Sequence, residues 1–274
     1  MLDPIRDWDD AFSNSAHIPG SETLPAQWAM AAATFRDSGV RIERDLPYGA
    51  APRARYDLVW PKGTPRGLAV FVHGGYWLQT DKSDWTHLAA GAVAAGWAVC
   101  LPGYTLAPQA RINEITSLVG AAISAAAQRV DGPIRLAGHS AGGHLATRMI
   151  CADTPLSGRV LDRVAHVTAI SGLFDLRPLL RTAMNDRLCL DQAEAVAESP
   201  ALLAPARAIP LTCWVGGGER PEFLRQSRLM AAIWDGLDVP TTLHIDVDHN
   251  HFSVIADLRD PDSALMRHWL TTDH

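Results

Sequence analysis

A serine flanked by glycines is the part of this chain best suited to chemistry. Residues 138–142 read Gly-His-Ser-Ala-Gly and fit the pattern Gly-x-Ser-x-Gly. The apolar run at 133–137 predicts a buried strand before them, and 143–151 predicts a helix after them. A strand, a sharp turn and a helix in this order form a nucleophile elbow, which holds a serine hydroxyl clear of the sheet. Both glycines are expected because so tight a turn leaves no space for a Cβ. Ser140 is therefore the predicted nucleophile.

A serine hydroxyl needs a base to take its proton, and two late histidines compete for that role. His249 and His251 both follow the last predicted strand, 243–247. We favour His251, which is followed by Phe252 and a helix-like segment. The two histidines could also suggest a metal, but the sequence shows no third ligand at a useful spacing. No metal site is predicted.

The acid that orients the histidine should follow the strand predicted at 211–215. Glu219 lies just beyond that strand, where a carboxylate could hold the imidazole tautomer and stabilise the imidazolium ion. Glu222 begins the next predicted helix, where an acid interacts favourably with the helix dipole, so we expect a structural role for it. Asp246 and Asp248, on or just after the last strand, stay open as alternatives.

A glycine-rich loop, His-Gly-Gly-Tyr-Trp at 73–77, directly follows the strand predicted at 68–72. Gly74 and Gly75 in this loop would provide one backbone N–H of an oxyanion hole, and Ala141, the residue after the nucleophile, the other. Losing one such donor costs about 3–4 kcal/mol of transition-state stabilisation. This chemistry uses no cofactor.

Apolar β-rich runs alternate with Ala- and Leu-rich helical stretches along most of the chain. This order predicts a mostly parallel sheet with helices on both faces. The remaining expected strands are 40–44 and 55–60, paired antiparallel, and 97–101 and 164–170; the remaining expected helices are 84–95, 112–130, 221–234 and 261–270. Residues 173–208, rich in Leu, Pro and Arg, interrupt the pattern and predict a small helical cap over the site, with a surface excursion as the alternative. Without a linker, repeat or low-complexity run, we expect residues 1–274 to form a single domain.

Composition narrows the class of protein further. Hydrophobic residues make up 47% and charged residues 20%, as in ordinary soluble domains. The net charge of 24 − 30 = −6 is dispersed, so nucleic acid is not an expected partner. The acidic start does not resemble a signal peptide, and no apolar stretch is long enough to cross a bilayer. Four scattered cysteines favour reduced thiols and a cytoplasmic location. The oligomeric state stays open, a homodimer included.

Together these residues resemble the kynurenine formamidase (arylformamidase) branch of the α/β-hydrolases. The matching segments are an opening segment at 14–19, HGGYW at 73–77, GHSAGG at 138–143, SGLFDLRPL at 171–179, VGGGERPEFLRQS at 215–227 and NHF at 250–252. The resemblance implies an α/β-hydrolase fold with Ser140 as nucleophile, Glu219 as acid and His251 as base. The family often carries aspartate where this chain has Glu219, which keeps the two late aspartates open as alternatives.

The resemblance also implies a substrate, an N-formyl arylamine, with N-formyl-L-kynurenine as the family's own. Tyr76 stands where related esterases carry a third glycine, and with Trp77 it would narrow the pocket and offer a face for an aromatic ring. Core packing is the alternative for both. Arg177 or Arg181 could pair with a carboxylate of the substrate. The alternative activity is a carboxylesterase or amidase acting on another small acyl group. A scaffold without activity is disfavoured because the serine and the histidine are both present.

Overall fold

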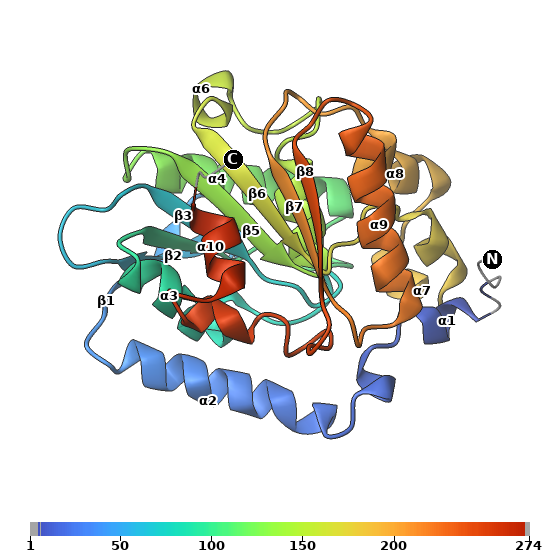
Figure 1. The fold of residues 1–274 in the computed structure, drawn as a ribbon, viewed down its shortest axis with the longest axis horizontal. Helices are drawn as coiled ribbons and strands as arrows, with labels where there is room; N and C mark the ends of the chain where they lie inside the picture. Colours follow the sequence, from blue (N-terminus) through green and yellow to red (C-terminus); the bar gives the residue numbers. More distant parts are fainter. Residues whose placement is uncertain (1–4, 6, 272–274) are drawn as a thin grey trace.

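The protein is described here from a computed structural model, which covers residue 5 and residues 7–271. An eight-stranded sheet forms its centre, in the order β1-β2-β4-β3-β5-β6-β7-β8 (Figure 1). The strands are β1 (Arg41–Pro47), β2 (Arg55–Trp60), β3 (Leu68–Val72), β4 (Ala98–Pro102), β5 (Ile134–His139), β6 (Val164–Ile170), β7 (Leu211–Gly216) and β8 (Thr241–Asp246). Strand β2 runs antiparallel to both β1 and β4, and all other neighbours are parallel. The mostly parallel sheet with an antiparallel pair at its edge confirms the predicted architecture.

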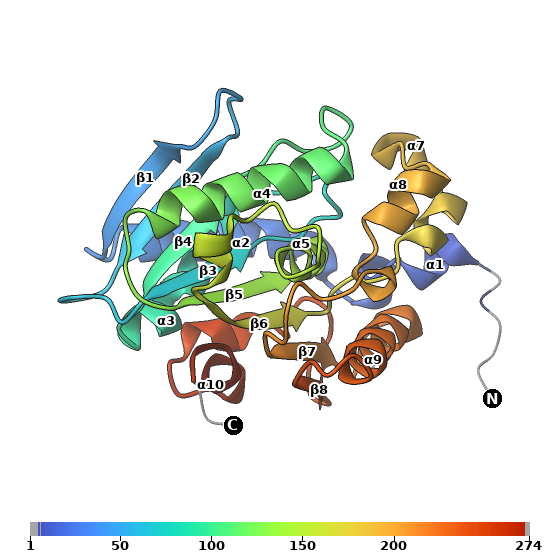
Figure 2. The ribbon, with the colours of Figure 1, turned by 90° about the horizontal axis from the view of Figure 1, so that it is seen from above.

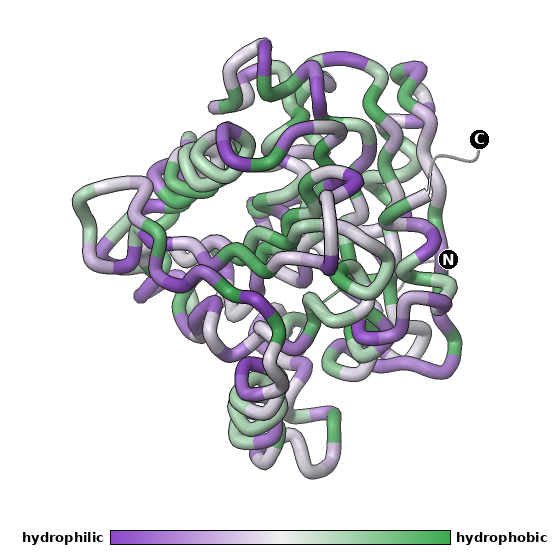
Figure 3. Tube along the Cα trace, turned by 90° about the vertical axis from the view of Figure 1, so that its left-hand side faces the viewer, coloured by the Kyte–Doolittle hydropathy of each residue, from purple (hydrophilic) through white to green (hydrophobic). Residues whose placement is uncertain are grey.

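Helices cover both faces of the sheet, as Figure 2 shows for α4 and α10. One face carries α4 (Ile112–Ala127), α5 (Ala141–Arg148) and α9 (Pro221–Asp235); the other carries the 3-10 helix η3 (Lys82–Ala89), α3 (Ala90–Ala94) and α10 (Ala264–Leu270). Strand β3 sends alternate side chains to the two faces: Val70 joins the first core and Phe71 the second. This two-sided burial explains why the central strands are continuous apolar runs. Figure 3 shows the hydrophobic residues concentrated along these inner segments.

Two predicted helices differ in detail from the structure. The single helix expected at 84–95 is a 3-10 helix followed by the short α3. The helix expected from residue 261 starts at Ala264, because the Ser263 side chain accepts a hydrogen bond from the Met266 N–H and caps the helix there. Short helices elsewhere are α6 (Gly158–Leu161) and η6 (Ala256–Arg259).

The N-terminal segment contains a helix that the sequence analysis did not anticipate. The short α1 (Trp8–Ala11), η1 (Ser15–His17) and η2 (Ser21–Thr23) lead into α2 (Leu24–Arg36), which runs along the outside of the molecule (Figure 1). Ala32 is the one residue of α2 that is fully buried, so the helix lacks the broad apolar stripe that would have revealed it. It docks through Trp28, whose ring centroid lies 4.7 Å from that of Trp85 on η3.

Segment 173–208 contains four short helices: η4 (Arg177–Arg181), α7 (Asn185–Leu188), α8 (Gln192–Ala197) and η5 (Pro200–Leu202). Figure 2 shows α7 and α8 at one end of the sheet, near α1. The segment contributes one residue, Met184, to the candidate site's cavity, while residues before 29 contribute many more. The N-terminal segment therefore covers much of the place expected for a cap.

The four cysteines are unpaired, and three of them, Cys100, Cys151 and Cys213, are buried. Burial raises the pKa of the Cys151 and Cys213 thiols to about 12, so both stay protonated at neutral pH. Within the described residues, no helix combines the length and the apolar character that crossing a bilayer requires.

Candidate active site

Ser140 lies in the sharp turn between β5 and α5. Its backbone has φ 57° and ψ −120°, a strained conformation that non-glycine residues rarely adopt outside functional sites. A Cβ on Gly138 would lie 2.0 Å from the Gly142 carbonyl oxygen, and a Cβ on Gly142 would lie 2.0 Å from that of Val72. The predicted reason for both glycines is thus confirmed. The geometry is that of a nucleophile elbow.

Among the described residues, Glu219 is the acid that holds His251. The Nδ1 atom of His251 lies 2.6 Å from Glu219 Oε2, and the two side chains are 3% and 0% exposed. The second oxygen, Oε1, accepts hydrogen bonds from Ser171 Oγ at 2.5 Å and from the Gly216 N–H at 2.8 Å. Because the carboxylate can only accept, Nδ1 carries the proton and Nε2 is free to act as a base. Sequence reasoning missed Ser171, although it lies in one of the motifs that carry the resemblance.

The rival residues lie in a separate cluster. His249 Nε2 is 4.0 Å from Asp246 Oδ2, and its Nδ1 is 3.1 Å from Ser253 Oγ. Asp248 is exposed. Potential ligand atoms of Asp246, His249 and Asp257 lie within 4.8 Å of one another, so the fold supplies a third group beside His249 that spacing along the chain did not suggest. His251 is not part of this group.

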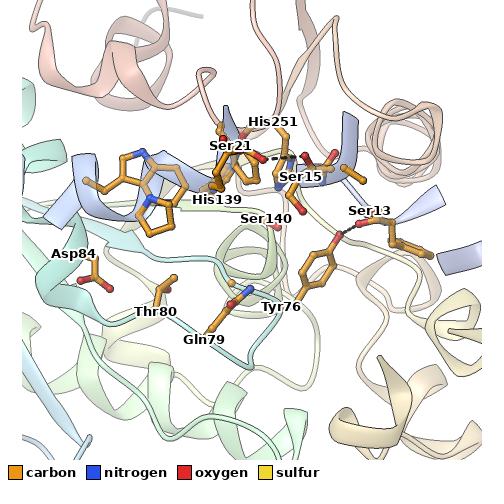
Figure 4. A pocket seen from close by; sticks show the side chains of 18 of the residues that line it. Ser13, Ser15, Ser21, Tyr76, Gln79, Thr80, Asp84, His139, Ser140 and His251 are labelled. Atoms are coloured by element: carbon orange, nitrogen blue, oxygen red, sulfur yellow. Dashed lines mark hydrogen bonds between the residues drawn. The ribbon is translucent and has the colours of Figure 1, made fainter. Parts of the chain in front are cut away.

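His139, the variable residue of the serine motif, directly precedes Ser140 in the chain and contacts His251. Its Nε2 donates to the backbone carbonyl of His251 at 2.8 Å, and the two ring centroids are 4.6 Å apart. Burial, together with the nearby His251, holds the pKa of His139 well below its ordinary range. The ring is therefore neutral at physiological pH. Ser140 and His251 line the same cavity, and Figure 4 shows them close to His139 in the middle of the view.

The glycine-rich loop lies directly against the elbow. A Cβ on Gly74 would be 2.7 Å from the His139 carbonyl oxygen. Gly75 has φ +100°, and a Cβ there would be 2.3 Å from the Gln79 carbonyl oxygen. Both positions therefore require glycine. Gly75 lines the cavity, and Ala141 is the first residue of α5, so its N–H has no acceptor within the helix.

His73 and Tyr104 support the glycine-rich loop through ring stacking and a hydrogen bond. Their rings stack with centroids 4.3 Å apart, and the Tyr104 hydroxyl donates to the His73 carbonyl at 2.8 Å. Thr80 Oγ donates to the Gly74 carbonyl at 3.0 Å. Burial lowers the pKa of His73 to about 4, so the support is uncharged at neutral pH.

The two aromatic residues of the loop have different positions. Tyr76 lines the cavity, and its hydroxyl donates to the Phe12 carbonyl at 2.5 Å. Burial raises the pKa of Tyr76, which keeps that donor protonated. Trp77 is fully buried and packs edge-on against His144 at 5.1 Å. The expected substrate contact of Trp77 is therefore corrected, because this side chain belongs to the core.

The cavity has a volume of about 930 Å³ and aromatic walls. Trp28, Trp85 and Phe252 line it, with the Trp28 ring 4.7 Å from Trp85 and 5.6 Å from Phe252. Its carboxylates come from Asp9, Glu22 and Asp84, and no lysine or arginine stands among the described residues that line it. Large apolar walls with a few polar groups are typical of a small-molecule site.

The arginines expected to bind a substrate carboxylate lie elsewhere. Arg177 forms a two-pronged ion pair with Asp175, both nitrogen–oxygen distances being 2.9 Å. The Arg181 guanidinium lies 5.4 Å from the ring centroid of Trp8. Neither lines the cavity. Of the two outcomes considered for these arginines, contact with a substrate or a place on the surface, the structure favours the second, since both side chains are occupied in structural contacts.

Comparison with known proteins agrees with this geometry. The chain is 28% identical to the kynurenine formamidase of Danio rerio over 232 residues, which cover 81% of this chain and 79% of the relative. It is 24% identical to the kynurenine formamidase of Drosophila melanogaster over 246 residues, or 84% of this chain and 80% of the relative. The resemblance noted in the sequence is thus confirmed.

Solved structures extend the comparison to the whole fold. A crystal structure from Silicibacter sp. tm1040, which carries the provisional name thioesterase, is 46% identical with a TM-score of 0.91 and covers 97% of this chain and 99% of its own. Esterase B of Lactobacillus rhamnosis, at 20% identity and a TM-score of 0.69 over 94% of this chain and 91% of its own, shares the fold. A family model described as alpha/beta hydrolase fold matches residues 69–251, which contain the elbow, the glycine-rich loop, Glu219 and His251. By these matches the protein is a hydrolase, and the chain belongs to the alpha/beta hydrolase fold family.

Proposed function

We propose that this protein is a serine hydrolase that removes a formyl group from an aromatic amine, with N-formyl-L-kynurenine as the first candidate substrate. One observation carries the proposal: Ser140 and His251 line the same aromatic-walled cavity, and His251 is paired with the buried Glu219 carboxylate. The similarity to kynurenine formamidases supports the choice of acyl group and amine.

The mechanism begins with attack of Ser140 Oγ on the formyl carbon while His251 Nε2 takes the hydroxyl proton. Glu219 stabilises the resulting imidazolium ion. The backbone N–H groups of Gly75 and Ala141 stabilise the negative charge that develops on the formyl oxygen. His251 then gives its proton to the departing amine nitrogen, and the carbon–nitrogen bond breaks. Water, activated by His251, hydrolyses the formyl-serine and releases formate.

The shape of the cavity favours a small acyl group and a flat leaving group. Tyr76 lies next to the glycines of the loop and is anchored to the Phe12 carbonyl, so it restricts the space near the nucleophile. A formyl group tolerates this crowding. The aromatic walls offer faces against which an arylamine can stack.

The test is hydrolysis of N-formyl-L-kynurenine, followed by formate release and by the absorbance of the free aromatic amine. We expect turnover that is abolished in Ser140→Ala. Labelling of Ser140 by a fluorophosphonate probe in the unchanged protein serves as a control for an active nucleophile. Turnover no faster than that of Ser140→Ala would refute the proposal.

The second candidate is a carboxylesterase or amidase that uses the same residues on another small acyl group. Structural neighbours named as esterases favour it, as does the provisional thioesterase name of the 46% identical structure. A panel of p-nitrophenyl acetate, p-nitrophenyl butyrate and formylated anilines separates the two. Higher kcat/KM for the butyrate than for the formamides would favour the esterase.

A further inference from the structure

The Asn14 side chain is buried in the cavity wall and is only weakly bonded there. It is 4% exposed, and among the described residues neither amide atom has a hydrogen-bond partner of ordinary length, although the amide interacts with the Tyr76 hydroxyl and lowers its pKa against the larger effect of burial. It lines the cavity that also contains Ser140 and His251. Buried polar groups are almost always hydrogen-bonded, so an unpaired amide beside a reactive serine points to a ligand.

Hydrogen bonds, ring packing and an ion pair fix the backbone that precedes Asn14. The Phe12 carbonyl accepts from the Tyr76 hydroxyl at 2.5 Å, and the Phe12 ring packs edge-on against Phe223 at 6.2 Å. The Arg220 guanidinium donates to the Asp10 backbone carbonyl at 3.2 Å and forms an ion pair with its carboxylate. These contacts fix the segment just before Asn14 on both the loop side and the α9 side.

Several neighbouring polar groups of the wall are already satisfied within the protein. Ser21 Oγ donates to the Ser15 carbonyl at 2.9 Å, and the Thr80 hydroxyl donates to the Gly74 carbonyl at 3.0 Å. The Tyr76 hydroxyl, which lies near Asn14, gives its proton to Phe12. Asn14 therefore keeps an N–H and an oxygen available to a ligand, and the Trp85 indole N–H is the other unpaired buried group among the described lining residues.

We propose that Asn14 is a specificity-determining residue whose amide Nδ2 donates a hydrogen bond to a carbonyl group on the leaving-group half of the substrate. The acyl half does not need it, because a formyl group has one oxygen and the amides of Gly75 and Ala141 serve that oxygen. In this respect the inference rests on the proposed function. Asn14 would thus favour aryl substrates that carry a ketone on the ring carbon ortho to the acylated atom, as N-formyl-L-kynurenine does.

The charges of the cavity favour a neutral carbonyl over a carboxylate as the partner of Asn14. The carboxylates of Asp9, Glu22 and Asp84 line the cavity, and its described lining residues include no lysine or arginine. A carboxylate placed against Asn14 would be repelled by these groups. The amino-acid end of N-formyl-L-kynurenine carries an ammonium group beside its carboxylate, so that end has no net charge to be repelled. A ketone oxygen accepts from an amide N–H and carries no net charge.

The experiment compares substrates with and without an ortho-acetyl group. One pair is formanilide and 2′-formamidoacetophenone, and the other is phenyl acetate and 2-acetylphenyl acetate. The ratio of kcat/KM between variant and wild type is taken for each substrate, so the intrinsic reactivity of the substrate cancels. For Asn14→Ala we expect a loss of about 3- to 10-fold on the acetyl-bearing member of each pair, as for one neutral hydrogen bond. The plain member should change less than twofold.

Two further variants make the comparison decisive. Asn113→Ala removes an exposed asparagine outside the cavity and should change neither member of a pair. Asn14→Asp is close in shape but, as a carboxylate, cannot donate, so it should show the same selective loss. It replaces Asn14→Ala should that variant fail to fold, as judged by thermal unfolding and by fluorophosphonate labelling of Ser140.

Equal losses on both members of each pair, or no loss on either, would overturn the inference. The first result would mean that Asn14 only supports the shape of the site. The second would mean that water satisfies its amide. Failure of the wild type to cleave any formamide would refute the proposed function alone, because the ester pair still tests Asn14.

Discussion

Replacing Glu219 by glutamine tests how the base is oriented. Glu219 Oε1 accepts two hydrogen bonds, from Ser171 Oγ and the Gly216 N–H, while Oε2 accepts one, from His251 Nδ1. A glutamine keeps its carbonyl oxygen where two donors converge, so its NH₂ group faces His251. The imidazole must then accept at Nδ1 and carry its proton on Nε2. In that tautomer the base cannot take the proton of Ser140.

The expected loss follows from this tautomer change. In the Ser-His-Asp triad of trypsin-like proteases, replacing the aspartate by asparagine lowers kcat by about 10⁴-fold. This fall corresponds to an activation barrier higher by roughly 5.5 kcal/mol. We expect a similar fall in kcat for Glu219→Gln with a small change in KM. Glu219→Ala should add a stability loss of about 2–5 kcal/mol, since the Gly216 N–H and the Ser171 hydroxyl both lose their acceptor.

The assay is steady-state hydrolysis of whichever substrate the wild type turns over best, with thermal unfolding as a check on folding. Asp246→Asn is the matched control, because Asp246 lies beside His249 and not beside His251. It should keep kcat within about twofold. A Glu219→Gln variant that retains more than a tenth of wild-type kcat, or an Asp246→Asn variant that is impaired more strongly, would show that this account of the acid is mistaken.

Three other perturbations have defined outcomes. Gly142→Ala should destabilise the fold by more than about 3 kcal/mol, because its Cβ would lie 2.0 Å from a buried backbone oxygen. Gly158→Ala is the control and should leave the Tm unchanged, because there is open space around its Cβ. Equal Tm values for the two variants would contradict the steric argument. His139→Phe removes the donor to the His251 backbone carbonyl and should lower kcat about 3- to 10-fold; it also leaves that buried carbonyl unpaired, which should lower stability by about 1–3 kcal/mol. An unchanged kcat would remove the positioning role of His139. Burial lowers the pKa of His73 to about 4 and that of His144 to about 3, so between pH 6.5 and these values the unfolded chain binds more protons than the folded one. Stability should therefore fall as the pH drops from 7.5 to 5, by roughly 2 kcal/mol per histidine, and urea midpoints that stay constant over this range would disprove it.

The strands were the most predictable part of the fold. Residues 68–72 and 164–170 match β3 and β6 at both ends, because a parallel strand buried on both faces is mostly apolar. Helix α2 was missed for the opposite reason: its exposed position demands little of its sequence, and it docks through a few side chains, with Trp28 packing against Trp85 and Phe252 and Arg36 bonding to η3. Since Trp28 and Asn14 come from this region, the cavity wall was also the least predictable part of the site.

The nucleophile needed no tertiary information. Gly138, Ser140 and Gly142 lie within one turn, and Gly138 is demanded by the Gly142 carbonyl inside that turn, whereas Gly142 is demanded by the Val72 carbonyl of the neighbouring β3. The local order of strand, turn and helix was therefore enough to propose Ser140 as the nucleophile, because the residues that form this turn are contiguous in the chain.

The partner of the base could be settled only in three dimensions. Strands β7 and β8 are parallel neighbours, so Glu219 and Asp246 both lie near the same edge of the sheet, and their chemistry is alike. The donors of Ser171 and Gly216 fix the Glu219 carboxylate against His251, while Asp246 lies beside His249. Trp77 and Tyr76 likewise adjoin in the chain, yet one is in the core and the other in the cavity. Which of two similar residues enters the site depends on packing between segments far apart in the chain. Residue type and spacing along the sequence do not predict that packing.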